Sequence, residues 1–374
     1  MKLGQPGKNK RLAIYFFYDK DGVVDDYIPF LLKDLNENVN ELLIVCNGQL
    51  TIEGRKKFNE LTSHILVRDN IGYDVWAYKE GLEYYGWDNL STYDEIILLN
   101  YTIMGPLYPF RTMFDEMSSK DLDFWGITRH YGVEYDPYGK CKYGYIPMHI
   151  QSSFMVFRSS MVKSIEFHRY WENMPKINDY AEAICLHEAI FTKEFMQKGF
   201  SCDTYVDTED LKEYSSYPLM LYPTELISNR KCPIFKRKTF YNQYEEFLDV
   251  SCGQSGYELY KYLVEKTNYD LNYIWDVLLR TANMADIKDR MQLNYILPTE
   301  THLANKKESP RVALFMHVYF MDLVDYCKRY AASMPLYADI YITTNSEAKK
   351  KLLEKTFENF GGRKVKVSVV ENRG

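Results

Sequence analysis

The sequence predicts an α/β fold built on a parallel sheet, and two observations lead to this prediction. Between residues 11 and 99, four short apolar runs of strand length alternate with three segments of helical pattern. Strands and helices that alternate in this way form parallel sheets covered by helices on both faces. The chain has 374 residues, of which 46% are hydrophobic, so it is long enough for one large or two ordinary domains.

Each expected strand is mostly apolar, which is typical of strands buried on both faces of a sheet. The strands are expected at residues 11–18, 41–46, 64–67 and 95–99, and the helices between them at residues 25–35, 52–61 and 75–85. Further along the chain we expect strands at residues 121–128 and 150–158, a Tyr/Gly-rich loop between them at residues 130–147, and helices at residues 164–172 and 180–198. Ligands of such sheets bind beyond the carboxyl ends of the strands.

The stretch RDNIGYDVWAYKEGL, residues 68–82, follows the third expected strand and carries an unusual turn. Asn70, Gly72 and Asp74 stand at alternate positions, whereas a plain surface turn needs only Asn-Gly. The spacing predicts a turn whose polar groups face a ligand. The alternative interpretation is that Asp74 or Asn70 caps the helix that follows.

Composition and charge exclude several classes of protein. The net charge of -6 gives no indication of nucleic-acid binding. No apolar run is long enough to span a membrane, and the basic start leads into a strand, so a signal peptide is not expected. Tyrosine is abundant, with 34 Tyr against 20 Phe, which suits sugar binding or reflects compositional drift.

The seven cysteines include no CxxC pair. An odd number without such a pair is typical of reduced thiols in a cytosolic protein. Motifs of other enzyme classes are also missing: the sequence holds no GxGxxG after the first strand, no GxSxG, no HExxH and no P-loop.

Two distant parts of the chain look alike. RLAIYFFY at Arg11 and RVALFMHVYF at Arg311 start similarly, and an asparagine-ending strand and an N-x-G turn follow each at similar intervals. The match predicts a second α/β unit, unless two generic strand–helix–strand units agree by chance. The chain stops at the second N-x-G, in the middle of that unit, so we expect a truncated piece. We therefore expect an α/β domain at residues 1–250, a helical connector and linker at residues 251–308, and the beginning of a second repeat at residues 309–374.

Several stretches, in the same order along the chain, resemble the rhamnan synthesis protein F family. They are YDKDGVVDDYIPFLL, RDNIGYDVWAYKEGL, YDEIILLNYTIMGPLYPF, DFWGIT, HIQSSFMVFR, HEAIFTKEFMQKGF and YDLNYIWDVLLR. Members of this family are bacterial rhamnosyltransferases that build rhamnose-rich cell-wall polysaccharides. The resemblance implies a glycosyltransferase A-type (Rossmann-like) fold, dTDP-L-rhamnose as donor and a lipid-linked polysaccharide as acceptor. It also implies a cytoplasmic location with peripheral contact to the membrane.

The resemblance gives the polar turn a role in donor binding. In glycosyltransferases of this fold, the base and ribose lie over the first strands. Asp19, directly after the first strand, would accept a hydrogen bond from the base or the ribose. Asn70 and Asp74 would close the other side of the pocket, and Gly72 would let the backbone approach the ligand.

The fourth strand is expected to end at the diphosphate, where these enzymes usually carry an Asp-x-Asp element. Here it ends in Asn100-Tyr101-Thr102, which leaves dependence on Mg²⁺ or Mn²⁺ open. We expect Asn100 and Thr102 to bind phosphate or sugar hydroxyls. The cations that could meet the diphosphate charge are Arg68, Lys79 and the basic run at residues 229–238. That run could instead be a solvated face or a contact with anionic lipid headgroups.

Transfer with inversion needs one general base. Glu188 in HEAIFT is the first candidate and His149 in MHIQSSF the second, while an exposed helix carboxylate is the alternative for Glu188. Asp123 and Trp125 are expected to shape the sugar subsite, or Trp125 to lie in the core. The missing Asp-x-Asp element also leaves a second function open, namely a non-catalytic domain that binds glycan or nucleotide and scaffolds a partner transferase.

Overall fold

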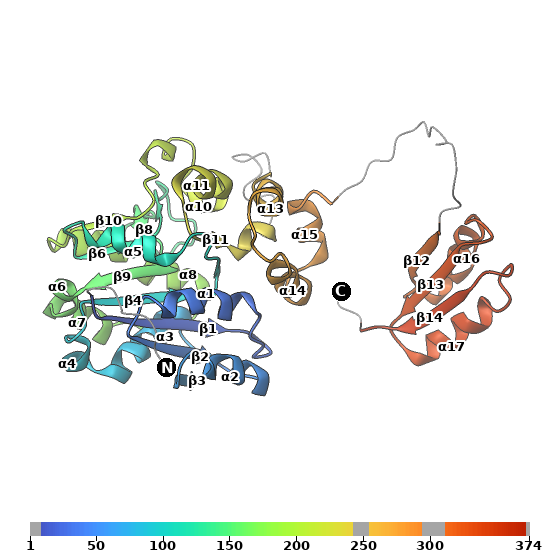
Figure 1. The fold of residues 1–374 in the computed structure, drawn as a ribbon, viewed down its shortest axis with the longest axis horizontal. Helices are drawn as coiled ribbons and strands as arrows, with labels where there is room; N and C mark the ends of the chain where they lie inside the picture. Colours follow the sequence, from blue (N-terminus) through green and yellow to red (C-terminus); the bar gives the residue numbers. More distant parts are fainter. Residues whose placement is uncertain (1–8, 242–253, 294–310, 372–374) are drawn as a thin grey trace. The chain divides into compact units, whose positions relative to one another are not determined.

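The computed structural model describes residues 9–241, 254–293 and 311–371, which fall into two compact units, Met1–Asn294 and Tyr295–Gly374. In the first unit a seven-stranded sheet has the order β10-β6-β9-β4-β1-β2-β3 (Figure 1). Its strands, in chain order, are β1 (Arg11–Tyr18), β2 (Glu41–Asn47), β3 (His64–Arg68), β4 (Glu95–Asn100), β6 (Phe124–Gly126), β9 (Phe154–Arg158) and β10 (Cys202–Thr204). β1 pairs in parallel with β2 and β4, whereas β9 runs antiparallel to β4 and β6. The predicted α/β fold class is confirmed, with a mixed sheet.

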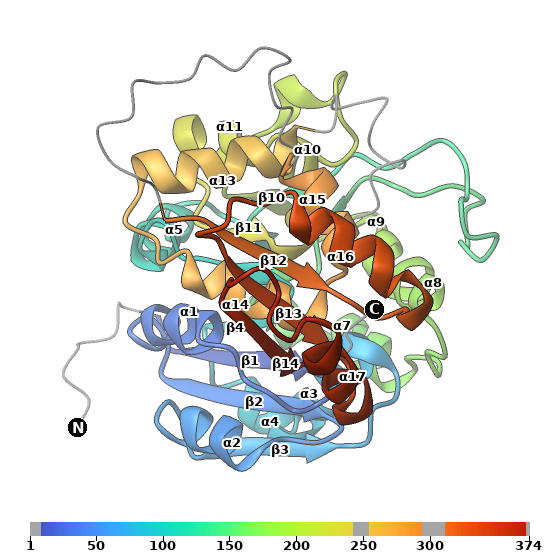
Figure 2. The same cartoon turned by 90° about the vertical axis from the view of Figure 1, so that its right-hand side faces the viewer.

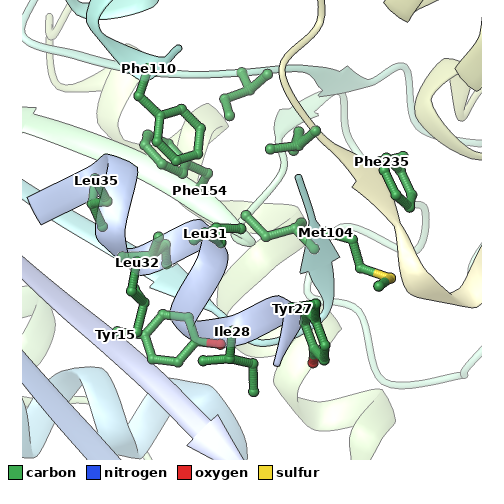
Figure 3. Close-up of a cluster of buried hydrophobic side chains, with 14 of the residues drawn as sticks. Tyr15, Tyr27, Ile28, Leu31, Leu32, Leu35, Met104, Phe110, Phe154 and Phe235 are labelled. Atoms are coloured by element: carbon green, nitrogen blue, oxygen red, sulfur yellow. The ribbon is translucent and has the colours of Figure 1, made fainter. Parts of the chain in front are cut away.

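Every residue of β1 after Arg11 is apolar or aromatic, and the strand is buried on both faces of the sheet. Ala13, Tyr15 and Phe17 belong to one hydrophobic cluster, and Leu12, Ile14 and Phe16 belong to another. Successive side chains of a strand point to opposite faces, so the two clusters lie on either side of the sheet. Figure 3 shows part of the first cluster, with side chains of α1 (Tyr27–Asn36) around Tyr15.

The helices of the first unit follow the strands with short connections. In the part that precedes residue 200 they are α2 (Ile52–Asn59), α3 (Tyr73–Tyr85), α4 (Trp87–Leu90), α5 (Phe110–Ser118), α6 (Ser159–Val162), α7 (Ile165–Glu172), α8 (Tyr180–Ala183), the π-helical turn η1 (Ile184–Glu188) and α9 (Ala189–Gln197). The second cluster includes Val75, Ala77 and Leu82 of α3. α3 approaches β1 closely at Gly81, where an added Cβ would lie 2.7 Å from Cγ2 of Ile14.

The first unit also has short strands and helices outside the seven-stranded sheet. They are β5 (Ile103–Met104), β7 (Arg129–His130), β8 (His149–Ile150), η2 (Glu209–Leu211), α10 (Pro218–Leu221), α11 (Pro223–Arg230), β11 (Phe235–Lys236) and η3 (Arg237–Phe240). β11 pairs antiparallel with β5, and β7 pairs antiparallel with β8.

Three helices from the expected connector pack on the first cluster. They are α13 (Ser255–Lys266), α14 (Asn272–Thr281) and α15 (Met284–Arg290). Each helix contributes side chains to the hydrophobic cluster that contains Tyr15, for example Leu259 of α13, Val277 of α14 and Ile287 of α15. The division between the two compact units therefore falls near residue 294, and the expected boundaries at residues 250 and 308 stay a prediction.

The second unit holds a parallel sheet of three strands in the order β12-β13-β14, which Figure 2 shows beside its helices. Its elements are β12 (Ala313–His317), η4 (Met321–Leu323), α16 (Val324–Ala332), β13 (Asp339–Thr344), α17 (Glu347–Thr356) and β14 (Val365–Val369). The alternation of strand and helix is the same as in β1, β2 and β3. The repeat stays a prediction, because its second N-x-G turn lies outside the described residues.

One expectation about the cysteines is wrong. Cys141 and Cys185 form a disulfide, with their Cα atoms 4.5 Å apart, so the thiols are not all reduced. The bond joins the Tyr/Gly-rich loop to η1, two segments whose proximity comes from tertiary packing rather than from sequence spacing. No helix in the described part of the chain is long and apolar enough to cross a membrane.

Candidate functional site

The carboxyl ends of β1, β2, β3 and β4 meet at one edge of the sheet, and most of the predicted donor-binding residues lie there. β1 is paired so that Phe16 lies opposite Asn100 of β4 and Tyr18 lies opposite Asn47 of β2. The turn after β3 starts α3 at Gly72, whose φ of 75° is accessible mainly to glycine. This edge is where parallel sheets bind ligands.

A line of hydrogen bonds crosses this edge from α3 to β11. Nδ2 of Asn100 donates to Oδ2 of Asp74 at 3.1 Å, and Oδ1 of Asn100 accepts from Oγ1 of Thr102 at 2.6 Å. Nζ of Lys236 in turn donates to Oγ1 of Thr102 at 3.2 Å. The structure thus brings together three predicted residues, Asp74, Asn100 and Thr102, and adds a lysine to them.

Lys236 comes from the basic run, and its position corrects one interpretation of that run. Because β11 pairs with β5, Lys236 lies opposite Ile103 and is only 9% exposed. Arg237 is turned inward, with its guanidinium over the ring of Tyr101, and Arg230 is paired with Asp210. The run is therefore not the exposed basic face that a contact with lipid headgroups would require.

Glu188 lies in the π-helical turn η1 between α8 and α9, and its carboxylate acts electrostatically on Lys236. Its Oε1 accepts a hydrogen bond from the backbone N–H of Ser152 at 3.1 Å. Single π-helical turns of this kind are frequent at functional sites. The neighbouring His187 points away into the core, where its Nδ1 lies 2.8 Å from the hydroxyl of Tyr170.

Asp74 and Glu188 influence each other electrostatically. Burial raises the pKa of Asp74 to about 6, and the Glu188 carboxylate adds to the rise, whereas Asn100 and Lys236 oppose it. Burial likewise lowers the pKa of Lys236 to about 8, against the effect of Glu188 and Asp74. Two carboxylates and one ammonium group thus share a site of restricted solvent access.

His149 lies near Glu188 but is held by the protein itself. Its Nδ1 is 2.8 Å from the carbonyl oxygen of Pro147, and its ring stacks on His130 with centroids 4.9 Å apart. Burial lowers the pKa of His149, and Glu188 partly offsets this effect. The imidazole is therefore neutral near pH 7, with its tautomer set by the Pro147 carbonyl.

Asp19, at the end of β1, interacts with Arg280 and with the backbone of its own loop. Its Oδ2 pairs with Arg280 of α14 at 2.7 Å, and the same guanidinium binds Asp25 at 2.5 Å. Its Oδ1 accepts hydrogen bonds from the backbone N–H groups of Asp21 and Val23. Asp19 therefore organises the loop after β1 and carries an ion pair that the sequence did not reveal.

Asn70, Gly72 and Arg68 contact other protein groups in the turn after β3. Oδ1 of Asn70 accepts from Nδ2 of Asn47 at 3.4 Å. The conformation of Gly72 is required by the chain, since an added Cβ would lie 2.3 Å from the Trp76 side chain. The N-cap residue of α3 is Gly72, which has no side chain to cap the helix, whereas the Asp74 carboxylate accepts a hydrogen bond from a backbone N–H of the first turn. The capping interpretation of the turn therefore stays a hypothesis.

Two of the predicted diphosphate cations are engaged elsewhere. Arg68 binds Oδ1 of Asn47 at 2.6 Å and Oε1 of Glu80 at 2.6 Å, which corrects the expectation that it meets the diphosphate. Lys79 donates to the carbonyl oxygens of Trp171 and Glu172. These charges hold α3 in place, whereas Lys236 and Arg237 lie beside the residues that follow β4.

The sugar-subsite expectations for Asp123 and Trp125 are not met. Trp125 is fully buried and packs edge-on against Phe114, so it is a core residue. Asp123 precedes β6 and binds Ser160 and Ser201, at the amino end of that strand and away from the ligand edge.

The seven-stranded mixed sheet and the polar residues at its ligand edge fit the α/β fold that the sequence predicts. The chain belongs to the rhamnan synthesis protein F family, whose model matches residues 42–374. The glycosyltransferase A-type fold that the resemblance implied agrees with this membership and with the mixed sheet.

A curated relative covers part of the chain. It is described as uncharacterized protein y4gN of Sinorhizobium fredii (strain NBRC 101917 / NGR234) and is 24% identical over 200 residues. These residues are 54% of this chain and 49% of the relative, so the chain spans about half the length of the relative it matches.

Solved structures with a partial likeness include two glycosyltransferases. GlyE of Streptococcus pneumoniae TIGR4 is 12% identical with a TM-score of 0.30, over 98% of this chain and 81% of GlyE. The mannosyltransferase Ktr4p of S. cerevisiae is 10% identical with a TM-score of 0.29, over 45% of this chain and 60% of Ktr4p. Because these TM-scores are low, we draw no residue-level conclusion from either.

Proposed function

We propose that this protein transfers L-rhamnose from dTDP-L-rhamnose to a growing lipid-linked cell-wall or capsular polysaccharide, with inversion at the anomeric carbon. Family membership supports the polysaccharide and the sugar class. The observation that supports the mechanism is that the Glu188 carboxylate, held by the backbone N–H of Ser152, is close enough to Lys236 and Asp74 to shift the pKa of both.

Glu188 is the proposed general base. The Ser152 backbone N–H fixes Oε1, and among the described residues no hydrogen-bond donor contacts Oε2, which leaves that oxygen for an acceptor hydroxyl. In an inverting displacement the acceptor oxygen attacks the anomeric carbon, its proton passes to the carboxylate, and dTDP leaves with the electrons of the broken C–O bond. A single base of this kind suffices for the reaction.

The donor would lie over the line from Asp74 to Lys236. Asp74 and the hydroxyl of Thr102 are placed to bind sugar hydroxyls or phosphate, with Asn100 holding both in position. The nucleotide would extend toward Asn70 and the loop that Asp19 organises. His149 is the second candidate for the base, and its contacts with Pro147 and His130 also suit a positioning role.

A cytoplasmic site at the inner face of the cell membrane belongs to the same proposal, because a nucleotide sugar and a lipid-linked acceptor would meet there. The proposal does not use the basic run as a membrane anchor. Nucleic acid has no part in it.

The donor is tested by competition between nucleotides. dTDP, UDP and GDP are titrated into the protein by calorimetry, and dTDP is expected to bind most tightly. Equal affinity for all three would count against dTDP-L-rhamnose as the donor.

A second function is favoured by one observation, the Asn100-Tyr101-Thr102 sequence at the end of β4, which carries no carboxylate. The protein would then bind nucleotide or glycan without catalysis and scaffold a partner transferase. Release of dTDP from dTDP-L-rhamnose in the presence of acceptor separates the two functions, because only the enzyme releases it.

A further inference from the structure

The residues at the end of β4 do not fit a divalent cation. Mg²⁺ and Mn²⁺ are held in proteins chiefly by carboxylate oxygens, yet β4 is followed here by neutral side chains. Oδ1 of Asn100 already accepts hydrogen bonds from both the backbone N–H and the hydroxyl of Thr102. The Lys236 ammonium lies 3.2 Å from that hydroxyl and would repel a metal ion bound to it.

Lys236 is a buried cation without a direct counter-ion. Among the described residues Lys236 forms no ion pair within 4.0 Å, and the Thr102 hydroxyl accepts the one hydrogen bond observed for its ammonium group. An ammonium group has three N–H donors and is costly to bury unpaired. Its side chain is nine-tenths buried, and its unused donors are those that an anionic ligand would take.

The neighbouring charges define where such an anion would lie. Asp74 and Glu188 act on Lys236 from a distance, as their effect on its pKa shows, and Lys238 acts with the opposite sign. Lys238 lies in η3, two positions after Lys236, and is exposed, whereas the guanidinium of Arg237 donates to the hydroxyl of Tyr27. An anion that contacts Lys236 would thus sit at the ligand edge, next to the proposed base.

We propose that Lys236 binds the diphosphate of the nucleotide-sugar donor directly and stabilises the leaving group, in the place where related enzymes hold a metal ion. As the bond between the anomeric carbon and the β-phosphate oxygen breaks, that oxygen gains negative charge and accepts a hydrogen bond from the ammonium group. This inference rests on the proposed function for the identity of the donor, but the phosphate site itself is testable without a sugar.

The test is calorimetric titration of inorganic pyrophosphate and of dTDP in buffer with EDTA. Wild-type protein is expected to bind both ligands without a divalent cation. Lys236→Met is expected to bind them about tenfold to a hundredfold more weakly, since a hydrogen bond to a charged group is lost. Lys231→Met, which removes an exposed lysine of the same basic run, is the matched control and should bind as the wild type does.

Two results would overturn the inference: binding of pyrophosphate only when Mg²⁺ or Mn²⁺ is added, or equal affinity in Lys236→Met and wild type. If Lys236→Met does not fold, Lys236→Arg is titrated in its place. Wild-type protein that does not bind pyrophosphate in the presence of EDTA would decide against the proposal in either case. If dTDP binds only with metal, the inference fails while the proposed function stands. If pyrophosphate binds through Lys236 without metal but dTDP binds no better than GDP, the phosphate site stands and the proposed donor fails.

Discussion

Nζ of Lys236 lies 3.2 Å from Oγ1 of Thr102, although 134 positions separate the two residues in the chain. The contact exists because β11 pairs antiparallel with β5, directly after the turn that ends β4. Through Thr102 and Asn100 it connects the lysine to Asp74 on the far side of the ligand edge. The site is therefore assembled from three separate segments of the first unit.

The affinity for dTDP in EDTA should fall as the pH rises through about 8. Burial lowers the pKa of Lys236 to about 8, so the group is a cation below that pH and neutral above it. Asp74, Glu188 and Lys238 are the charged groups that influence it. Calorimetry at pH 7.0 and pH 9.5 measures the change. Lys236→Arg keeps its charge over this range and should show no such fall, so the same pH dependence in both proteins would contradict the assignment.

Replacing Asp74 by Asn should stabilise the protein at neutral pH. The folded-state pKa of Asp74 is about 6, above its usual value of 3.8, so the native state holds the proton more tightly than the unfolded state. Stability is then lost as the pH rises from about 4 to 6, by about 3 kcal/mol in all. Urea unfolding should show this loss in wild type and a flatter profile in Asp74→Asn.

The control for that experiment has the opposite sign. Burial opposes the shift at Asp123, but hydrogen bonds from Ser160 and Ser201 lower its pKa, so this carboxylate stabilises the fold above its unfolded-state pKa. Asp123→Asn should therefore lose stability at neutral pH relative to acid pH. A stability difference for Asp74→Asn that is the same at pH 4 and pH 7.5 would show that its carboxylate is not perturbed.

Glu188→Gln should retain dTDP affinity and lose sugar transfer. Loss of a general base typically lowers the rate by about a hundredfold to ten-thousandfold. Glu194→Gln, which changes a carboxylate of the neighbouring helix α9 that pairs with Lys142, is the matched control and should stay active. Near wild-type transfer by Glu188→Gln together with an inactive His149→Ala would move the role of base to His149.

Arg280→Gln should destabilise the first unit by about 3 to 5 kcal/mol, because it leaves two buried carboxylates, Asp19 and Asp25, without their partner. Arg111→Gln breaks an exposed pair with Asp115 and should change the unfolding free energy by about 0.5 kcal/mol or less. Urea unfolding compares the two variants. Equal effects would mean that the Arg280 ion pairs add nothing beyond a surface interaction.

The Cys141–Cys185 disulfide should leave at most five of the seven cysteines free to react with a thiol reagent in denaturant. All seven should react after reduction. A bond that joins residues 44 positions apart is expected to contribute about 4 kcal/mol to stability by restricting the unfolded chain. Seven reactive thiols before reduction would contradict the bond.

The first four strands of the first sheet, β1, β2, β3 and β4, could be predicted closely because each is a largely apolar run, whereas β6 and β9 are shorter than expected and β10 was not predicted. β1 spans Arg11–Tyr18 as expected, and β2 and β4 end one residue later than expected, at Asn47 and Asn100. The antiparallel direction of β9 could not be predicted, since periodicity gives no strand direction. For the same reason, the pairing of β5 with β11 could not be predicted from the sequence.

The site was predicted in part for a related reason. The sequence could predict site residues that lie at the end of a strand or on an expected helix. Asn100 and Thr102 lie at the end of β4, Asp74 lies after β3, and Glu188 lies in the helix expected at residues 180–198. The burial of Lys236 and the ion pair between Asp19 and Arg280 depend on contacts between distant segments, which residue spacing does not encode.

The central claim, that this protein transfers rhamnose from dTDP-L-rhamnose with Glu188 as base, is tested most directly by one assay. Protein, dTDP-L-rhamnose and a lipid-linked rhamnose-containing acceptor are incubated together, and released dTDP and the anomeric configuration of the product are measured. The prediction is equimolar release of dTDP and an α-linked rhamnose product in wild type, with both lost in Glu188→Gln. Release of dTDP without an elongated product, a β-linked product, or no release at all would contradict it.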